Sequence, residues 1–279
     1  MFNATEIIIE SFIDRLKENY SRTYGIQNPD YPGILAFIGR ISLENISKTD
    51  AAYHDLLHTI LVADVGQEIL FGKQLSRGGV TPGDWLNYVT ATLCHDIGYV
   101  RGVCLGDGEE DFVINMEGER VHISKGATDA ALTPYHVDRS KIFVRERFAD
   151  VDFIDTAITD VLIEATRFPS SDQVVSGDLG EMANLVRGAD LIGQMGDPGY
   201  LRKAAALFQE FEETGSNARL GYTSPEHLRT GYPKFFWSMI QPDLAKSIKY
   251  LNMTQSGKAW VSNLYANVFI EEHSVKVKR

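Results

Sequence analysis

Apolar side chains recur at every third or fourth position along most of the chain, which is the spacing of amphipathic helices. The pattern is clear over residues 5–20, which Thr5 can cap, over residues 51–71, which stop near Gly72, and over residues 84–97. Further helices are predicted at 140–148, 153–166, 181–192, 200–213, 234–240, 244–251 and 259–270. Because alternating strand patterns are few, the sequence predicts an all-α protein.

One segment, residues 101–125, departs from this pattern because it is rich in Gly, Asp and Glu and has weak periodicity. We expect it to form a surface excursion that covers or flanks a pocket. No repeat of fixed period and no low-complexity linker divides the chain. We therefore predict one multi-helix domain over residues 46–279, with residues 1–45 as an N-terminal helical extension packed on it.

The net charge of the chain indicates which kinds of molecule it can bind. The 279 residues carry a formal net charge of −11, which argues against polymeric nucleic acid because phosphate backbones demand a surplus of Lys and Arg. A small phosphorylated molecule is compatible with this charge, since metal ions in a pocket supply the positive charge that the surface lacks.

The cysteine content and the hydropathy indicate a cellular location. Only Cys94 and Cys104 occur, with no zinc-ribbon or disulfide-framework spacing. No basic segment precedes the short apolar run 7–9, and no apolar stretch reaches the roughly 18 residues that span a bilayer. We predict a cytoplasmic protein that does not associate with a membrane, and a helical surface of this kind is compatible with a homodimer.

His54 and His58 are the first candidate site residues. At positions i and i+4 of the predicted helix 51–71, they are expected to project two imidazoles from one helix face. By itself such a pair is more often a polar feature of a helix surface or a hydrogen-bonded part of the core.

The pair His95-Asp96 carries more information because it ends a strongly apolar run, residues 88–94. A buried imidazole and carboxylate are costly without partners, and a metal ion satisfies both. Asp190 repeats this argument on another predicted helix, among Ala189, Leu191 and Ile192. The alternative for Asp190 is a buried salt bridge, for which Arg187 is a candidate.

The order of these residues, a His, then an adjacent His-Asp, then a distant Asp on helices, resembles the HD superfamily of metal-dependent phosphohydrolases. Residues 53–58, Tyr-His-Asp-Leu-Leu-His, are similar to the Tyr-His-Asn-x-x-His element of class I cyclic nucleotide phosphodiesterases. Weaker counterparts follow in the same order, so that the resemblance covers residues 51–269. It implies a helical HD/phosphodiesterase-like domain.

Carried over by position, the resemblance implies that His58, His95, Asp96 and Asp190 bind a first metal ion and that Asp96 bridges to a second. It implies that His54 is the general acid, which protonates the leaving group after metal-activated hydroxide attacks phosphorus. Carboxylate and imidazole ligands suit one or two divalent ions, Mg, Mn, Fe or Zn.

The chain departs from the phosphodiesterase pattern at several positions. Asp55 replaces an Asn and is expected to raise the pKa of His54, and Tyr99 stands where the family has a further His. The Glu-Asn-His-His run is replaced by residues 143–146, Phe-Val-Arg-Glu, and Tyr232 occupies the place of the purine-binding Gln. The surroundings of a second metal are therefore altered, and recognition of a cyclic nucleotide does not follow.

The remaining candidates have weaker support. His122 and His136 fall between His95-Asp96 and Asp190, where some HD enzymes place further metal ligands, although a surface His is the commoner case. Arg101 and Lys125 are candidates for phosphate contacts, with solvated surface charges as the alternative. Aromatic residues 235–237, with Phe235 first, either wall a substrate pocket or belong to the core.

The sequence therefore predicts a metal-dependent phosphohydrolase whose substrate is a small phosphoester, a nucleotide or a cyclic nucleotide above all. Two alternatives stay open. A degenerate HD module binds a nucleotide or a protein partner without turnover, and a di-iron HD oxygenase requires His122 and His136 as true ligands.

Overall fold

The computed structural model describes residues 2–169 and 175–277 and shows one predominantly helical domain, as the apolar spacing predicted. The N-terminal part contains α1 (Ala4–Tyr24), α2 (Tyr31–Ile46), α3 (Leu56–Arg77), α4 (Pro82–Cys94) and the 3-10 turn η1 (Ile97–Tyr99). The middle contains strands β1 (Asp111–Val113) and β2 (Arg120–His122), η2 (Asp129–Leu132), α5 (His136–Phe148), α6 (Thr156–Glu164) and α7 (Gly177–Met195). The last part contains η3 (Tyr200–Arg202), α8 (Ala204–Glu213), α9 (Ser216–Leu220), α10 (Pro225–Phe235), the π-helical turn η4 (Phe236–Ile240), α11 (Gln241–Leu251) and α12 (Gln255–Val277).

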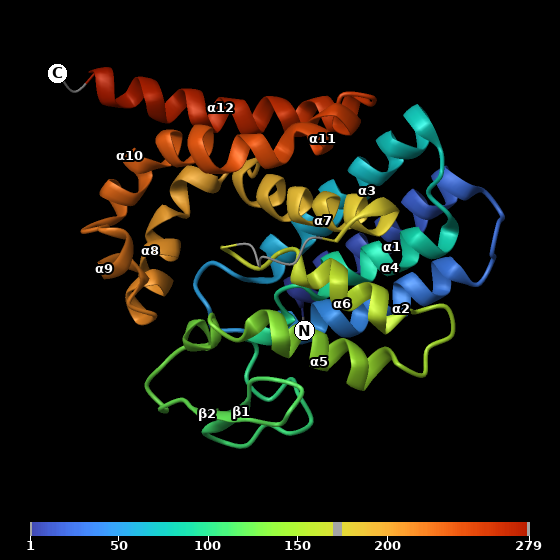
Figure 1. The fold of residues 1–279 in the computed structure, drawn as a ribbon, viewed down its shortest axis with the longest axis horizontal. Coiled ribbons are helices and arrows are strands. Elements are labelled where there is room, and N and C mark those ends of the chain that lie inside the picture. Colours follow the sequence, from blue (N-terminus) through green and yellow to red (C-terminus); the bar gives the residue numbers. More distant parts are fainter. Residues whose placement is uncertain (1, 170–174, 278–279) are drawn as a thin grey trace.

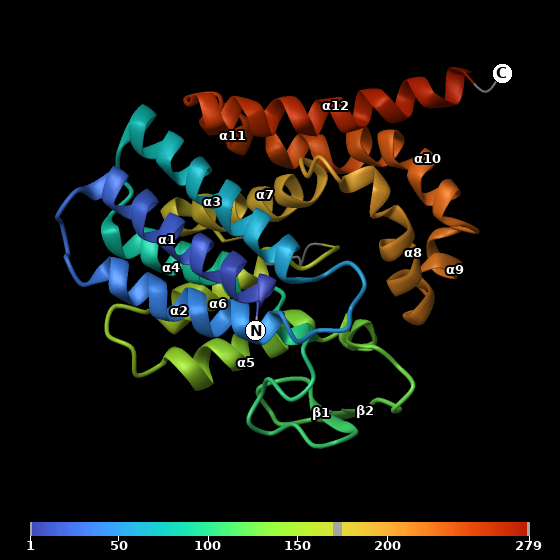
Figure 2. The ribbon, with the colours of Figure 1, turned by 180° about the vertical axis from the view of Figure 1, so that it is seen from behind.

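A large core joins most of these elements. Buried side chains of α1 and α2, such as Leu16 and Leu35, pack in the same cluster as Val62 of α3 and Leu86 of α4. A small separate cluster, made of Tyr53, Leu207 and Leu228, lies under α8 and α10. Figures 1 and 2 show α8, α9 and α10 as an arm beside the main body, with α11 and α12 along one edge and the β1–β2 hairpin at the opposite edge. Within the described residues, no helix is both long and apolar enough to cross a lipid bilayer.

The prediction of a helix over residues 51–71 is wrong at both ends, since the observed helix is α3, Leu56–Arg77. It begins at Leu56, because the Asp55 side chain accepts a hydrogen bond from the backbone N–H of His58 at 2.9 Å and so caps α3. It continues through Gly72 to Arg77, and Gly72 is where the helix meets the backbone of Tyr250. His54 therefore precedes the helix and does not share a helix face with His58.

The segment 101–125, expected to be irregular, contains a short antiparallel hairpin in which Phe112 pairs with Val121. The expected helix 84–97 ends at Cys94, and the chain turns at His95 and Asp96 into η1. The expected helix 234–240 is divided between the end of α10 and η4. The differences in the helices lie at element boundaries, where local spacing is least informative.

The turn η1 packs very closely on the start of α5. A Cβ atom placed on Gly98 would lie 2.0 Å from the carbonyl oxygen of His136. The backbone N–H of Gly98 donates to Ser140 Oγ at 2.9 Å, and Ser140 Oγ donates to the carbonyl of His95 at 2.8 Å. The buried Arg139 guanidinium donates to the carbonyl of Gly98 at 2.7 Å. These contacts fix the segment 95–99 against α5.

We predict that Gly98→Ala destabilises the protein by about 3 kcal/mol, because the added methyl group must displace the backbone of α5. Urea unfolding of the two proteins measures this difference. Gly126→Ala is the control, since no atom lies within 4 Å of a Cβ built there. Equal free energies of unfolding for Gly98→Ala and the wild type would contradict the close approach.

Candidate metal and acid–base site

The close packing of α3 on α7 brings His58 and Asp190 together. A Cβ atom on Gly193 would lie 2.8 Å from the Cα atom of Val62, so no side chain fits between the two helices there. His58 lies one turn before Val62, and Asp190 lies one turn before Gly193. As a result, His58 Nε2 lies 3.6 Å from Asp190 Oδ1.

His95 and Asp96, which follow the end of α4, lie next to His58 and Asp190. His95 Nε2 lies 3.1 Å from Asp96 Oδ2 and 3.6 Å from Asp190 Oδ1. His58 Nε2 lies 3.2 Å from Asp96 Oδ2. The structure thus brings together His58, His95, Asp96 and Asp190, the four residues predicted as metal ligands, and three of them, His58, His95 and Asp190, offer atoms within 4.8 Å of one another.

The hydrogen bonds around His95 and Asp96 leave His95 Nε2 and Asp96 Oδ2, the atoms directed into the cluster, without partners among the described residues. His95 Nδ1 lies 2.9 Å from the carbonyl of Thr92, and because a carbonyl oxygen only accepts, Nδ1 carries the proton. In the neutral ring Nε2 then presents a lone pair toward the two carboxylates. His95 Nε2 and Asp96 Oδ2 are both buried and lack a hydrogen-bond partner of acceptable geometry. A divalent cation at this point satisfies both atoms, so the donor set fits a metal ion.

The charges of the cluster are strongly interdependent. Burial alone would lower the pKa of His95, but the carboxylates of Asp96 and Asp190 outweigh it and raise that pKa well above its usual value. Burial alone would raise the pKa of Asp96, but the neighbouring imidazoles hold it well below the usual range. The carboxylates therefore stay ionised, as metal ligands must be.

His54 lies at the edge of this cluster and has its own acidic partner. Its Nδ1 lies 2.6 Å from Oε2 of Glu210, and Glu210 Oε1 accepts hydrogen bonds from the backbone N–H groups of Tyr53 at 2.7 Å and His54 at 3.2 Å. Burial acts to lower the pKa of His54, but the Glu210 carboxylate outweighs it and raises that pKa to about 9. The imidazole is therefore held as a protonated acid at neutral pH.

The expectation that Asp55 raises the pKa of His54 is wrong, because Asp55 caps α3 and Glu210 is the carboxylate that faces the ring. Sequence reasoning missed Glu210, which is one acidic residue among several near the end of α8 and has no local feature that distinguishes it. Its role depends on α8 lying over the segment before α3.

Of the two further histidines, only His136 reaches the site. Its Nδ1 donates to the carbonyl of Thr133 at 2.6 Å, and its Nε2 lies 3.7 Å from Asp96 Oδ1, whereas Asp96 Oδ2 is the oxygen nearest to His58 and His95. His122 lies on the hairpin with 60% of its side chain exposed and faces Asp111 at 3.4 Å. His122 is therefore not part of the cluster.

The basic candidates are engaged elsewhere. Arg101 pairs with Asp50 and Asp129, and Lys125 lies 3.7 Å from Glu110. Arg187 pairs with Asp243 at 3.0 Å and not with Asp190, so the salt-bridge alternative for Asp190 is wrong.

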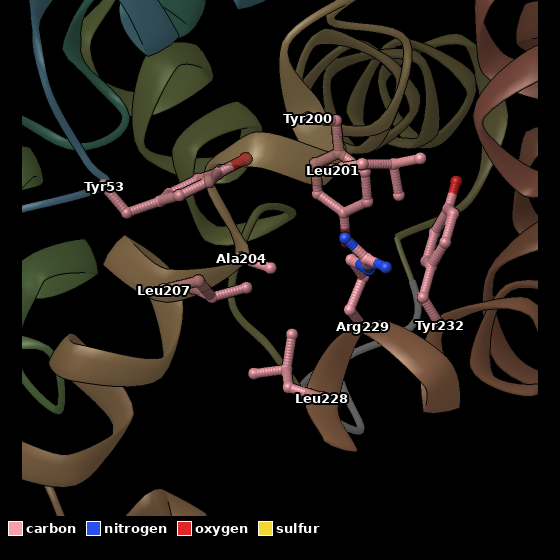
Figure 3. A pocket seen from close by; sticks show the side chains of 8 residues that line it. All are labelled: Tyr53, Tyr200, Leu201, Ala204, Leu207, Leu228, Arg229 and Tyr232. Atoms are coloured by element: carbon pink, nitrogen blue, oxygen red, sulfur yellow. The ribbon is translucent and has the colours of Figure 1, made fainter. Parts of the chain in front are cut away.

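The aromatic candidates lie outside the cluster of His58, His95, Asp96 and Asp190. Tyr232 lines a small cavity together with Tyr53, Tyr200, Leu207 and Leu228 (Figure 3). The cavity has space for about one water molecule, so a nucleobase does not fit it as it stands. The buried hydroxyl of Tyr232 has no hydrogen-bond partner among the described residues.

Phe235 packs edge-on against Phe168, with ring centroids 6.0 Å apart. It is also one of the partly buried residues that border the main core. This placement assigns a packing role to Phe235.

Comparison with known proteins identifies the family of the chain. The model of the Npun_R2479-like family matches residues 2–274, so the chain belongs to this family. A search of curated proteins finds no match.

We predict that the purified protein binds a divalent ion and that His95→Ala or Asp190→Asn weakens this binding by at least about 100-fold, because each removes a donor atom from the cluster. Elemental analysis and titration of the metal-free protein with Zn²⁺ and Mn²⁺ measure the effect. His122→Ala is the matched control and should bind like the wild type, since its side chain lies outside the cluster. Equal affinities for all four proteins would contradict the proposed donor set.

We also predict that Glu210→Gln lowers the free energy of unfolding of the metal-free protein by about 3 kcal/mol at pH 6. The pKa of His54 is raised from 6.5 to about 9 in the folded protein, so this stabilisation is complete below pH 6.5 and is lost as the pH rises through 9. Urea unfolding at pH 6 and pH 10 measures the difference.

Glu213→Gln on the same helix is the control, because the Glu213 carboxylate accepts hydrogen bonds from Thr128 and faces no imidazole. Its effect should be equal at both pH values. A Glu210→Gln effect that is also independent of pH would show that the pair does not form.

Proposed function

We propose that this member of the Npun_R2479-like family is a metal-dependent phosphohydrolase that cleaves small phosphoesters, with nucleotides and cyclic nucleotides as the first candidates. One observation carries the proposal: two carboxylates and two imidazoles converge in a buried cluster, and a third, acid-paired imidazole lies at its edge. This arrangement joins a cation site to a proton donor, which hydrolysis of a phosphoester requires.

His58, His95, Asp96 and Asp190 would hold the first ion through their free nitrogen and oxygen atoms. Imidazole and carboxylate donors suit Mg, Mn, Fe or Zn. When bound, such an ion supplies Lewis-acid polarisation of a phosphoryl oxygen and a water of lowered pKa. Asp96 Oδ1 and His136 Nε2 face each other at 3.7 Å and offer a place for a second ion with fewer protein ligands.

His54 would act as the general acid. Its Nδ1–H is directed at Glu210, which leaves Nε2 as the nitrogen that can deliver a proton to a leaving oxygen. A departing alkoxide is a poor leaving group until it is protonated, so a charged imidazole beside the cluster supports this role. Glu210 would hold both the orientation and the charge of the ring.

The exposure of the side chains supports one direction of approach for a substrate. The side chains of His58 and His95 are only 3% and 1% exposed. Those of His54 and His136 are 16% exposed each, and that of Asp190 is 21% exposed. A substrate would therefore approach on the side of the three more exposed residues. A phosphoryl group would then lie between the cation site and the candidate acid.

The oxygenase alternative has less support than the hydrolase. It requires His122 as a ligand, and this residue lies on the exposed hairpin. The binding-module alternative is favoured by the altered residues around a second metal, such as Tyr99, but it has less support than the hydrolase because the candidate acid and the cluster are both present. Binding of a nucleotide without turnover would distinguish it from the hydrolase.

We predict that the metal-loaded wild type hydrolyses at least one member of a panel of cyclic nucleotides, linear nucleotides and bis(p-nitrophenyl) phosphate. Asp96→Ala should abolish turnover by removing a carboxylate from the cluster. His54→Gln should lower kcat by about 10²- to 10⁴-fold, with metal content unchanged, because it removes only the proton donor.

His122→Ala serves again as the control and should retain wild-type turnover. Nucleotide binding by the wild type without any product would favour the binding module over the hydrolase.

A further inference from the structure

The ring of Tyr99 stacks on two imidazoles of the site. Its centroid lies 4.6 Å from that of His54 with the planes 10° apart, and 4.5 Å from that of His136 with the planes 23° apart. The side chain of Tyr99 is almost completely buried. One aromatic ring thus contacts both the candidate acid and the imidazole that faces Asp96.

The backbone connects this ring rigidly to the cluster. Tyr99 belongs to η1, the turn that follows Asp96, and its N–H donates to the carbonyl of Asp96 at 3.1 Å. The neighbouring Gly98 contacts α5 through its hydrogen bond with Ser140. The position of the Tyr99 ring is therefore set by the same turn that places Asp96.

Stacking and hydrogen bonding restrict different motions of an imidazole. The bond from His54 Nδ1 to Glu210 sets the direction in which the ring points, but it leaves the ring able to tip about that bond. A flat aromatic surface against the ring opposes this tipping. His136 has the same two restraints, a carbonyl acceptor from Thr133 at Nδ1 and the Tyr99 ring against its face.

We propose that Tyr99 is a positioning residue that holds the imidazoles of His54 and His136 in fixed planes beside the metal cluster. The consequence for catalysis rests on the proposed function. A proton donor has to stay within about 0.5 Å and 10–20° of its productive geometry, and a misplacement of about 1 Å costs on the order of 100-fold in rate. It is the stacked ring, rather than the phenol hydroxyl, that provides this restraint.

The experiment compares the wild type with Tyr99→Leu and Tyr99→Phe, all with zinc bound. Carbon-13 labelling of histidine resolves the ring Cε1–H signals of the seven histidines, and their relaxation reports ring mobility. In Tyr99→Leu we expect the signals of His54 and His136 to lose their ring-current shielding and the rings to become more mobile. The signal of His122 stays in place, and Tyr99→Phe keeps the wild-type spectrum.

Turnover of the best substrate of the panel is the second measurement. Tyr99→Leu is expected to lower kcat by about 10- to 100-fold with KM within about twofold and zinc content unchanged, while Tyr99→Phe restores the wild-type rate. Tyr88→Leu is the matched control for the loss of a buried tyrosine, because Tyr88 is fully buried in α4 and its hydroxyl donates to the carbonyl of Leu185 at 2.9 Å.

Unchanged imidazole spectra in Tyr99→Leu would overturn the proposal. A Tyr99→Leu protein whose rings move freely but whose kcat equals that of Tyr88→Leu would overturn the catalytic consequence. A Tyr99→Phe protein as impaired as Tyr99→Leu would assign the effect to the hydroxyl and overturn the role of the ring. A wild type that turns over no phosphoester contradicts the proposed function alone, and the spectra then decide on Tyr99 by themselves.

Discussion

The burial of Asp96 and the partial burial of Asp190 against two imidazoles, where α3, α4 and α7 meet, are the constraint on which the rest of the structure depends. An isolated carboxylate in such a place costs several kcal/mol, and this cost is reduced only if each oxygen faces a partner. Asp96 meets that condition, with Oδ2 facing His58 and His95 and Oδ1 facing His136, and the partly exposed Asp190 directs Oδ1 toward His58 and His95. The helices can deliver these groups to one point because glycine at position 193 lets α7 approach the backbone of α3.

The surroundings of the cluster serve mainly to orient it. Backbone carbonyls fix one nitrogen of His95 and one of His136, and Glu210 does the same for His54. Glu210 belongs to the arm formed by α8, α9 and α10, which has its own small apolar cluster against Tyr53 (Figure 1). The position of this arm is therefore a requirement of the site as well as of packing.

Local periodicity predicted most of the helices because an amphipathic face is visible within a few turns of sequence, but it did not predict α9 or most of α10. It predicted the start of α3 wrongly, since Asp55 extends no apolar pattern and acts through a single capping bond. The hairpin 111–122 also escaped prediction, because its strands of three residues are too short to show alternation. Because α3 starts at Leu56, His54 lies in the loop before the helix and does not share a helix face with His58.

The sequence by itself determined the helical class of the protein and pointed to His95, Asp96 and Asp190, because charged residues inside apolar runs indicate a buried polar cluster, whereas His58 became a candidate ligand through the resemblance to the HD superfamily. Only the tertiary structure decided between His136 and His122, separated Arg187 from Asp190, and brought Glu210 to His54 across 156 positions of sequence. The physical reason is that the cost of burying a charge is visible in its neighbours along the chain, whereas the partner that offsets this cost is chosen by which helices approach each other.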